Sequence, residues 1–326
     1  MQAQRRAGER LDLVVIESRA LTASIRTLRL ADPTGATLPG WTPGSHVKVR
    51  LPDGDERSYS LVNPCADRTA TAAPQAYCLG VRLEEAGQGG SRHMHALKPG
   101  DRVSLSHPAN HFPLERCEQP VVLVAGGIGV TPILSMAATL QAEGRPYRFI
   151  YAGRSRDQLA FLREIEALAG PALSLHADDV SGLFDIAGLM ASLQDEPLYL
   201  CGPTPMIEAA ITAAKALGWS EGRLRFEIFA TPVPVAGDQP FEVVLKSSGR
   251  RYQIPADKSI LDVLIEAGED PLHDCKRGDC GICQIGVIEG VPDHRDFILS
   301  DSEKAAGKLM QICVSRAKTP SLVLDL

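Results

Sequence analysis

Four of the eight cysteines in this chain of 326 residues form a set that could bind a metal. Cys275, Cys280 and Cys283 lie within nine positions of the segment HDCKRGDCGICQIGV, and Cys313 follows in MQICVSR after 29 intervening residues. Tetrathiolate zinc sites usually consist of two short Cys-x2-Cys pairs, whereas this pattern has one compact loop and one distant ligand. The spacing is typical of plant-type [2Fe–2S] clusters, with zinc as the alternative.

The geometry of such a cluster explains the residue types around the cysteines. Two irons and two bridging sulfides form a flat rhomb, so one loop can supply three thiolates and a second segment the fourth. The loop must also bring backbone N–H groups to the sulfurs, because these bonds stabilise the reduced, more negative cluster. Gly278 and Gly281 permit that close approach of the backbone.

A second set of residues could bind a dinucleotide. In AGGIGVTP, which follows a predicted strand and opens a predicted helix, Gly126, Gly127 and Gly129 favour a tight turn. Backbone N–H groups in such a turn can face a pyrophosphate at the positive end of the helix. Thr131 can add a hydroxyl, and Pro132 is tolerated in the first helical turn. The segment differs from the Gly-x-Gly-x-x-Gly fingerprint, and a plain strand–helix turn is the alternative.

The segment YAGR places Arg154 at the carboxyl end of the next predicted strand, where an adenosine ribose binds in parallel sheets. Arg154, Ser155 and Arg156 could hold the 2′-phosphate of NADPH, or they could be solvated surface residues. Both nicotinamide nucleotides therefore stay open on these residues alone.

Composition excludes several classes of protein. The formal charge of −6 and the lack of a Lys/Arg block give no signal for nucleic-acid binding. No run of 18 apolar residues predicts a membrane span, and the first residues lack the apolar core and cleavage site of a signal peptide. The other four cysteines are scattered, which favours one metal site in a reducing compartment over a disulfide framework. We expect a cytoplasmic protein.

Three segments with different patterns must position these residues. The first alternates apolar and polar residues in short runs bounded by Gly, Pro, Asn and Asp, which predicts an antiparallel six-stranded barrel. A short helix is expected at residues 92–97. The expected strands are residues 11–18, 25–32, 44–52, 56–63, 76–84 and 101–108.

The second segment alternates strands with helices, which predicts a doubly wound parallel sheet with helices on both faces. The expected strands lie within residues 120–129, 147–154, 173–179, 197–203 and 224–229. The expected helices span residues 131–144, 157–170, 185–193 and 204–218.

The third segment follows a Pro-rich linker. It is expected to contain a hairpin over residues 241–254, a helix over residues 259–268 that Ser259 caps, and a last strand over residues 321–326. The predicted organisation is a disordered lead-in (1–9), a flavin barrel (10–114), a nucleotide domain (115–229), a linker (230–240) and a cluster domain (241–326).

The segments CKRGDCGIC, GVPDHRD and MQICVSRA together resemble a plant-type ferredoxin (β-grasp) domain at the C-terminus of a reductase. With the order of the three segments, nearly the whole chain from about residue 10 resembles the phthalate dioxygenase reductase family, which includes the vanillate demethylase reductases. The resemblance implies an FMN-binding barrel, a nicotinamide-binding domain and a ferredoxin domain. It also implies that electrons pass from NADH, the family's usual donor, to a Rieske-type terminal oxygenase.

The resemblance implies roles for the residues of RSYSL and of a later Gly-rich turn. Arg57 would contact the flavin phosphate, Tyr59 would pack on the flavin and its ribityl chain, and Ser60 would hydrogen-bond near N5. Ser58 belongs to the same segment. The flavin ring would be bordered by the backbone of Gly80, Val81 and Arg82. The flavin phosphate would be held by the turn at Gly89, Gly90 and Ser91. FMN is favoured over FAD, but FAD stays open as an alternative. A plain turn without a ligand is the alternative for residues 89–90.

The resemblance also places the turn CGPTPM beside the nicotinamide, with Cys201, Gly202 and Pro203 in the turn and Met206 in the following helix. Phe229 would cover the flavin face that the nicotinamide must reach. Ser60, Cys201 and Phe229 are thus the predicted catalytic residues, although ordinary core roles are open for the last two. Cys201 is not expected to be a nucleophile, because hydride transfer needs positioning rather than covalent attack.

The three parts together predict a converter of electron pairs into single electrons. A nicotinamide donates two electrons at once, a cluster accepts one, and a flavin can do both. The rim at Lys276, Arg277 and Asp279 is the expected docking surface for the acceptor, and the resemblance suggests a monomer. A cytochrome P450 or another acceptor, or an iron–sulfur carrier without turnover, are the alternatives.

Overall fold

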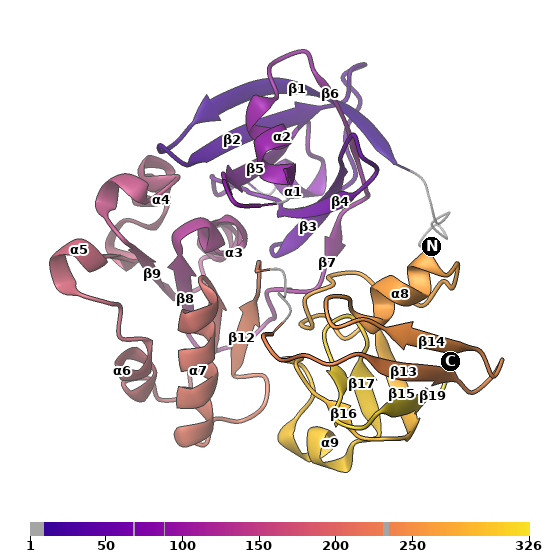
Figure 1. Ribbon diagram of the computed structural model, residues 1–326. Helices are drawn as coiled ribbons and strands as arrows, with labels where there is room; N and C mark the ends of the chain where they lie inside the picture. The colour runs from indigo at the N-terminus through magenta and orange to yellow at the C-terminus, as the bar shows by residue number, and fades with distance from the viewer. Residues whose placement is uncertain (1–9, 68, 88, 231–234) are drawn as a thin grey trace. The chain divides into compact units, whose positions relative to one another are not determined.

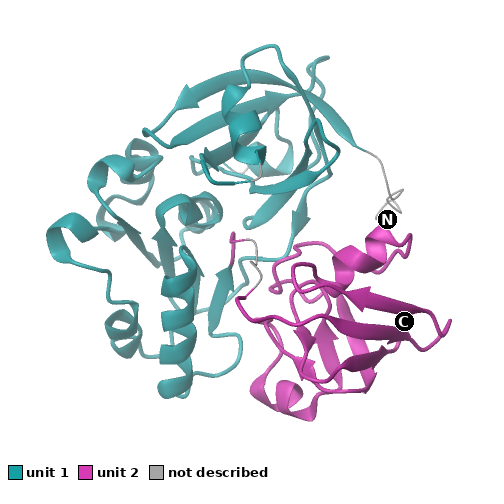
Figure 2. Cartoon of the chain, in the orientation of Figure 1, with its two compact units in different colours: residues 1–227 teal, residues 228–326 magenta. Residues whose placement is uncertain are grey.

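The structure is a computed structural model that describes residues 10–67, 69–87, 89–230 and 235–326. The chain divides into two compact units (Figures 1 and 2): unit 1 ends at Glu227, and unit 2 runs from Ile228 to Leu326. The predicted lead-in and residues 231–234 of the predicted linker lie outside the described residues. The predicted domain boundaries stay predictions.

The first part of unit 1 is the expected antiparallel barrel, in the strand order β4-β3-β6-β1-β2-β5 (Figure 1). A bridge between Leu61 and Leu79 of β5 closes it, and Val62 N–H donates to Cys78 C=O at 2.9 Å beside that bridge. The strands are β1 (Leu11–Ala20), β2 (Ile25–Ala31), β3 (Ser45–Arg50), β4 (Glu56–Ser60), β5 (Tyr77–Arg82) and β6 (Arg102–Leu105).

Alternation of side chains builds the barrel core. Successive side chains of a strand point to opposite faces, so every second residue can turn inward. Leu13 and Val15 of β1, and Val47 and Val49 of β3, are buried in one apolar cluster in this way. Tyr59 of β4 packs against the same cluster. The minor elements of this part are α1 (Thr69–Ala72), α2 (Gly90–Ala96) and β7 (Ala109–Asn110), which pairs with β3.

The second part of unit 1 is the expected parallel sheet, in the order β10-β9-β8-β11-β12. The chain moves from β8 outward to one edge and then returns to β11 beside β8, so the strand order reverses between these two strands. The strands are β8 (Val121–Gly126), β9 (Tyr147–Gly153), β10 (Leu173–Ala177), β11 (Leu198–Cys201) and β12 (Leu224–Glu227).

The helices of this sheet form two groups, because α3 packs beside α4 and α6 beside α7. Four of them correspond to the predicted helices. The helices are α3 (Val130–Glu143), α4 (Leu162–Ala169), α5 (Asp178–Ser181), α6 (Ile186–Ala191) and α7 (Thr204–Ala216), with single turns at η1 (Gly127–Gly129), η2 (Arg156–Gln158) and η3 (Gly170–Ala172).

Unit 2 contains a mixed sheet in the order β14-β13-β19-β15-β17, with β13 parallel to β19, and a separate pair of β16 and β18. The predicted hairpin and last strand are present, and the Ser259 hydroxyl caps α8 by accepting from Asp262 N–H. The strands are β13 (Phe241–Leu245), β14 (Arg251–Ile254), β15 (Gln284–Glu289), β16 (Pro292–Asp293), β17 (Leu309–Gln311), β18 (Arg316–Ala317) and β19 (Ser321–Leu324). The helices are α8 (Ile260–Glu266) and α9 (Asp301–Ala306).

None of the helices in the described residues combines the length and the apolar character needed to cross a lipid bilayer.

Candidate functional site

The fold of unit 2 brings the four predicted cluster ligands together. Cys283 directly precedes β15, and Cys313 lies two residues after β17. These strands are antiparallel neighbours, with Gln284 paired to Gln311, and Ile312 N–H donates to Cys283 C=O at 3.3 Å. The sheet therefore places the distant fourth ligand beside the end of the three-cysteine loop.

The loop itself has no helix or strand from Cys275 to Cys283, and its shape depends on residues with positive φ. Gly278 adopts φ +84°, and a Cβ atom there would lie 2.7 Å from Val314 Cγ2, next to the fourth cysteine. Only glycine lets the loop lie so close to the second ligand segment. Gly281 adopts φ +78°.

The thiols lie within hydrogen-bonding reach of one another. The neighbouring side chains of Cys280 and Cys313 hold the pKa of the Cys275 thiol well below its ordinary value. Cys313 likewise lowers the pKa of Cys283. Arg277 N–H donates to Cys275 Sγ at 3.3 Å, and no disulfide joins any of the four. Four gathered thiols with a backbone donor fit a tetrathiolate iron–sulfur cluster.

The cluster loop also holds the first residues of unit 2. The Asp279 carboxylate accepts from Ile228 N–H at 3.0 Å, and burial raises the pKa of Asp279 to about 6. The Arg277 guanidinium lies 5.9 Å from the ring centroid of Phe229. Phe229 is thus positioned by the loop, and its predicted role over the flavin stays a prediction.

The glycines of AGGIGVTP form the predicted tight turn at the carboxyl end of β8. Gly127 adopts φ +54° in η1, and Tyr151 OH donates to its C=O at 3.2 Å. The Thr131 hydroxyl donates to Ile128 C=O at 3.1 Å and is buried, as is Pro132 in the first turn of α3. The turn therefore leads directly into the helix N-terminus.

The CGP turn lies against this glycine turn. Cys201 ends β11 and pairs in register with Ala125 of β8. A Cβ on Gly129 would lie 2.1 Å from Cys201 C=O, and one on Gly126 would lie 2.6 Å from Pro203 Cδ and 3.3 Å from Met206 Cε. Gly202 lies between these contacts. Both turns thus line the place where the strand order reverses, which is where open α/β sheets bind ligands.

Two of the three polar residues after β9 are already engaged. The Ser155 hydroxyl donates to the Asp157 carboxylate, and Arg156 pairs with Glu166 at 2.6 Å. Arg154 is exposed, and its backbone C=O accepts from Asp179 N–H. A 2′-phosphate would have to displace acidic partners here.

The fold brings the two predicted halves of the flavin phosphate site together. A Cβ on Gly90 would lie 2.8 Å from Arg57 Cγ, so the start of β4 and the start of α2 are in contact. The Arg57 guanidinium is partly exposed and pairs with Asp55 at 3.2 Å. Gly89 adopts φ +94°, and the Ser91 hydroxyl accepts from Glu84 N–H at 2.9 Å. These groups fit an anion that replaces the acidic partner of Arg57.

The remaining flavin residues lie on β4 and β5. Ser58 and Tyr59 are half-buried, Ser60 is buried, and burial raises the pKa of Tyr59 to about 12. Gly80 and Val81 are buried in β5, whereas Arg82 is exposed and pairs with Glu84. A backbone edge of small residues beside a half-buried aromatic side chain fits a flat ring system.

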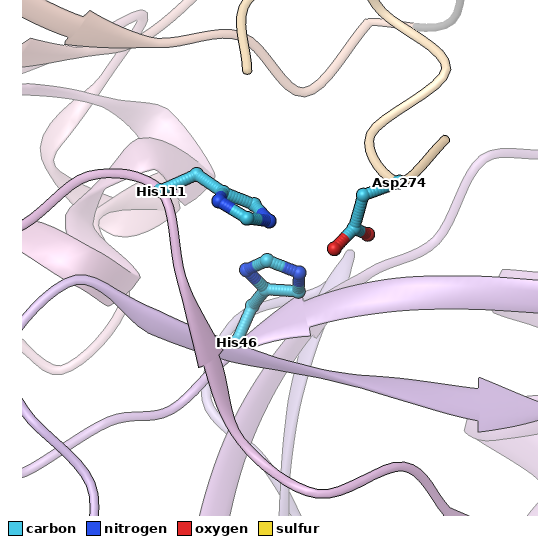
Figure 3. A group of neighbouring side chains, drawn as sticks. All are labelled: His46, His111 and Asp274. Atoms are coloured by element: carbon cyan, nitrogen blue, oxygen red, sulfur yellow. The ribbon is translucent and has the colours of Figure 1, made fainter. Parts of the chain in front are cut away.

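Histidines of the barrel lie on β3, on α2 and directly after β7. His95 Nε2 lies 2.9 Å from Val81 C=O. The rings of His46 and His111 lie 5.3 Å apart between centroids, tilted by 47° (Figure 3). Asp274, which Figure 3 also labels, belongs to unit 2.

Two residues beside these sites were missed by sequence reasoning. Ser135 of α3 is fully buried and hydrogen-bonds to the segment after β4. Phe161 adopts φ +58°, and its ring lies 3.0 Å from where a Cβ on Gly80 would be. A serine on an apolar helix, four residues after Thr131, was the one sequence signal for the first of them.

Two segments of the chain match known domain families. Residues 243–318 match the 2Fe-2S iron-sulfur cluster binding domain, and residues 123–212 match the oxidoreductase NAD-binding domain. The first segment contains all four clustered cysteines, and the second contains both turns at the strand reversal.

Several relatives align with this chain over nearly its whole length and theirs. The chain is 39% identical over 325 residues to tetrachlorobenzoquinone reductase of Sphingobium chlorophenolicum, covering 97% of this chain and 98% of that protein. It is 38% identical over 322 residues to vanillate O-demethylase oxidoreductase of Pseudomonas sp. (strain HR199 / DSM 7063), covering 97% and 100%. A solved structure of phthalate dioxygenase reductase, described as modular for electron transfer from pyridine nucleotides to [2Fe-2S], is 36% identical with a TM-score of 0.73, covering 97% of this chain and 98% of that one.

The fold and the matched domains define an NAD-dependent electron-transfer oxidoreductase with an iron–sulfur domain. Relatives more than 30% identical span nearly the whole chain, and the chain belongs to the phthalate dioxygenase reductase family. It is a reductase of the kind that serves aromatic oxygenase and demethylase systems. The family, fold class and nicotinamide and [2Fe–2S] cofactors predicted from the sequence are thereby confirmed.

Proposed function

We propose that this chain carries electrons from NADH, through FMN and a [2Fe–2S] cluster, to a Rieske-type terminal oxygenase. The observation that carries the proposal is the gathering of four thiols in a unit whose sequence matches cluster-binding domains. When bound, the flavin accepts a hydride from the nicotinamide and releases the two electrons singly to the cluster.

The side chains and backbone of unit 1 bind and orient the reactants. The N–H groups of the turn at Gly126, Gly127 and Gly129 bind the pyrophosphate at the start of α3. The turn at Cys201–Pro203 limits where the nicotinamide ring can lie, because it already contacts the glycine turn. Positioning and exclusion of water are sufficient for hydride transfer, so no general acid or base is assigned.

The flavin phosphate binds between Arg57 and the turn at Gly89–Ser91. Arg57 exchanges the exposed Asp55 carboxylate for the phosphate, and a guanidinium suits that bidentate contact. Tyr59 supplies an aromatic surface for the ring, and Ser60 supplies a hydroxyl near N5. Phe229 is the residue assigned to covering the flavin face that the nicotinamide must reach.

NADH is the preferred donor. Asp157 and Glu166 engage two of the three residues that could hold a 2′-phosphate, and their negative charge opposes it. The 2′-phosphate of NADPH would have to displace both carboxylates from these residues, whereas NADH has no 2′-phosphate.

The acceptor docks on the exposed rim of the cluster loop. Of the three predicted rim residues, Lys276 is exposed and pairs with Asp262 at 3.2 Å in an ion pair of little energetic value. Arg277 and Asp279 are half-buried. Redox partners commonly meet through small, transient interfaces. We further propose that the protein is a monomer and that it lies in the cytoplasm. The scattered cysteines favour such a reducing compartment.

The decisive experiment mixes the purified, anaerobic protein with NADH or NADPH and follows the flavin and cluster absorption bands. NADH should bleach both sets of bands, and the reduced protein should then reduce a Rieske oxygenase of an aromatic demethylase system. Zinc in place of iron and acid-labile sulfide would exclude the cluster. Faster bleaching by NADPH would exclude NADH as the preferred donor.

A quinone is the second candidate acceptor. The chain is 39% identical to tetrachlorobenzoquinone reductase, about as close as it is to the vanillate O-demethylase oxidoreductase. Efficient NADH-dependent reduction of a halogenated quinone, without reduction of any Rieske oxygenase tested, would favour this acceptor. A cytochrome P450 acceptor would be found by the same assay with that partner.

A further inference from the structure

A buried hydroxyl joins the two halves of the hydride-transfer site in unit 1. Ser135 lies on α3 and is fully buried. Its Oγ accepts from Asn63 N–H at 2.9 Å and donates to Leu61 C=O at 2.8 Å. One side chain of the nucleotide sheet's first helix therefore holds both ends of a three-residue backbone segment of the barrel.

The bonded segment directly follows the flavin strand. Ser60 is the last residue of β4, and Leu61 comes next in the chain. Leu61 also forms the bridge to Leu79 that closes the barrel. A shift of Leu61 or Asn63 would therefore shift Ser60 and the seam between β4 and β5.

The helix end of this contact leads to the nicotinamide turn. Ser135 lies one helical turn after Thr131, on the same face of α3. The Thr131 side chain packs on the barrel, because a Cβ on Gly80 would lie 2.7 Å from Thr131 Cγ2. The first two turns of α3 thus rest on β5 through Thr131 and on the end of β4 through Ser135.

We propose that Ser135 is a positioning residue for hydride transfer, fixing the flavin strand β4 relative to the nicotinamide turn at the start of α3. The inference rests on the proposed function, because that function requires the flavin and the nicotinamide to be held at a fixed spacing. Ser135 itself contacts neither the flavin nor the nicotinamide, and it acts through Leu61 and Asn63.

The physical reason is the distance dependence of the reaction. A hydride leaves C4 of the nicotinamide with both electrons of the C–H bond and bonds to N5 of the flavin, which leaves NAD⁺ and needs no other reactant. A misplacement of about 1 Å can slow such a step roughly a hundredfold. Two hydrogen bonds buried from water fix the barrel segment more tightly than exposed contacts would.

The test compares three variants of the full-length protein with bound cofactors. Ser135→Ala removes both bonds, and Ser135→Cys keeps a weak donor and acceptor at the same place. Ser18→Ala is the matched control, since its hydroxyl also accepts one bond, from Arg26 at 2.9 Å, and donates one, to Leu97 C=O at 2.8 Å, but joins two parts of the barrel only.

Three measurements are made on each variant. Stopped-flow absorption gives the rate constant of flavin reduction and its primary isotope effect with NADH deuterated at the transferred position, over a range of temperature. Titration gives the Kd of NAD⁺. Hydrogen exchange followed by mass spectrometry reports the protection of the Asn63 amide without any turnover.

The expected result for Ser135→Ala is flavin reduction slower by about tenfold, with the Kd of NAD⁺ changed less than about twofold. Its isotope effect should become more temperature-dependent and the peptide containing Asn63 should exchange faster, with Ser135→Cys intermediate. Flavin reduction by Ser135→Ala at the wild-type rate and isotope effect would overturn the proposal, as would an equal slowing by Ser18→Ala. Should Ser135→Ala lose its flavin, the same criteria apply to Ser135→Cys.

Wild-type protein whose flavin NADH does not reduce would overturn the proposed function as a whole. If instead NADH reduces the flavin of the wild-type protein and of Ser135→Ala equally fast, only the role of Ser135 is overturned.

Discussion

At the scale of single residues, the cluster loop concentrates unusual backbone conformations. Lys276, Gly278 and Gly281 have φ values of +54°, +84° and +78°, within six positions of the chain. A left-handed conformation costs a non-glycine residue about 1–2 kcal/mol, so the surrounding structure must maintain it at Lys276. Such conformations are expected where a backbone turns its N–H groups toward bound sulfur.

Gly278→Ala should weaken the cluster site more than its conformation alone explains. A positive φ costs alanine about 1 kcal/mol, and the new Cβ would in addition lie 2.7 Å from Val314 Cγ2. Gly249→Ala is the matched control, because Gly249 has φ +68° and a Cβ there would meet no atom within 4 Å beyond its chain neighbours. Iron and sulfide per chain and the thermal midpoint should fall further for Gly278→Ala. Equal losses in both variants would contradict the role of the contact with Val314.

At the scale of elements, the end of the predicted linker is bound to unit 2. Arg295 donates to both carboxylate oxygens of Asp238, and Arg316 Nε lies 3.7 Å from it. Arg316 is buried and donates to three backbone carbonyls, those of Lys258, Pro255 and Gln239. The end of the predicted linker is therefore held within unit 2 by these bonds.

Asp238→Asn should destabilise unit 2 by an amount that is constant from pH 8 to pH 5. The hydrogen bonds from Arg295 lower the pKa of Asp238 from 3.8 to about 2. A depressed carboxyl pKa stabilises the folded state above the unfolded value and loses that effect as the pH falls through the folded value. The difference in thermal midpoint from wild type should therefore begin to shrink only below about pH 4. Asp257→Asn, at an exposed position, is the control, and a difference that varies between pH 5 and pH 8 would refute this origin.

Much of the fold could be predicted, because long elements show their periodicity in the sequence. All six barrel strands, the five parallel strands and the cap at Ser259 lie where alternation and turn residues place them. Short elements such as α1, α5 and β16 have too few residues for a pattern. The helix expected from residue 157 begins only at Leu162, since Phe161 turns left-handed before it to pack on the barrel.

The site could be predicted as motifs, but their mutual contacts could not. The ligands of the cluster follow from spacing, whereas the contact of Gly90 with Arg57 and that of Gly129 with Cys201 join segments far apart in the sequence. Ser135 shows the limit most clearly, because its two hydrogen-bond partners lie more than 70 positions away. Only the packing of a helix on the barrel reveals its role.

At the scale of the whole molecule, the chemistry divides between two units. Unit 1 contains the residues predicted for flavin and nicotinamide except Phe229, and unit 2 contains every cluster cysteine. In the proposed function, the reaction with the donor depends mainly on unit 1, and the delivery to the acceptor depends on unit 2.

A chain that ends after residue 240 should keep the donor reaction and lose delivery. NADH should still reduce its flavin, and ferricyanide should still be reduced, because unit 1 contains the other residues predicted for both ligands. Phe229 remains in the shortened chain but loses the cluster loop that positions it. Reduction of a Rieske oxygenase should fall to background. Full-length Cys283→Ser, which keeps unit 2 but lacks a ligand, should show the same pattern. Oxygenase reduction by the shortened chain at the full-length rate would show that the cluster is bypassed.

The way in which the barrel closes bears on how it acquires its flavin. The residues directly after β4 meet β5 through the bridge at Leu61 and Leu79 and the bond from Val62 to Cys78, whereas β2 pairs with β5 along six residues. Parting β4 from β5 breaks fewer backbone bonds than parting β2 from β5, and it uncovers the strand that carries Arg57 and Tyr59. FMN should therefore enter and leave the barrel where β4 meets β5, and the hydrogen bonds of Ser135 should keep this seam closed. Removing those bonds should speed the dissociation of FMN as well as the binding of FMN by the protein without flavin.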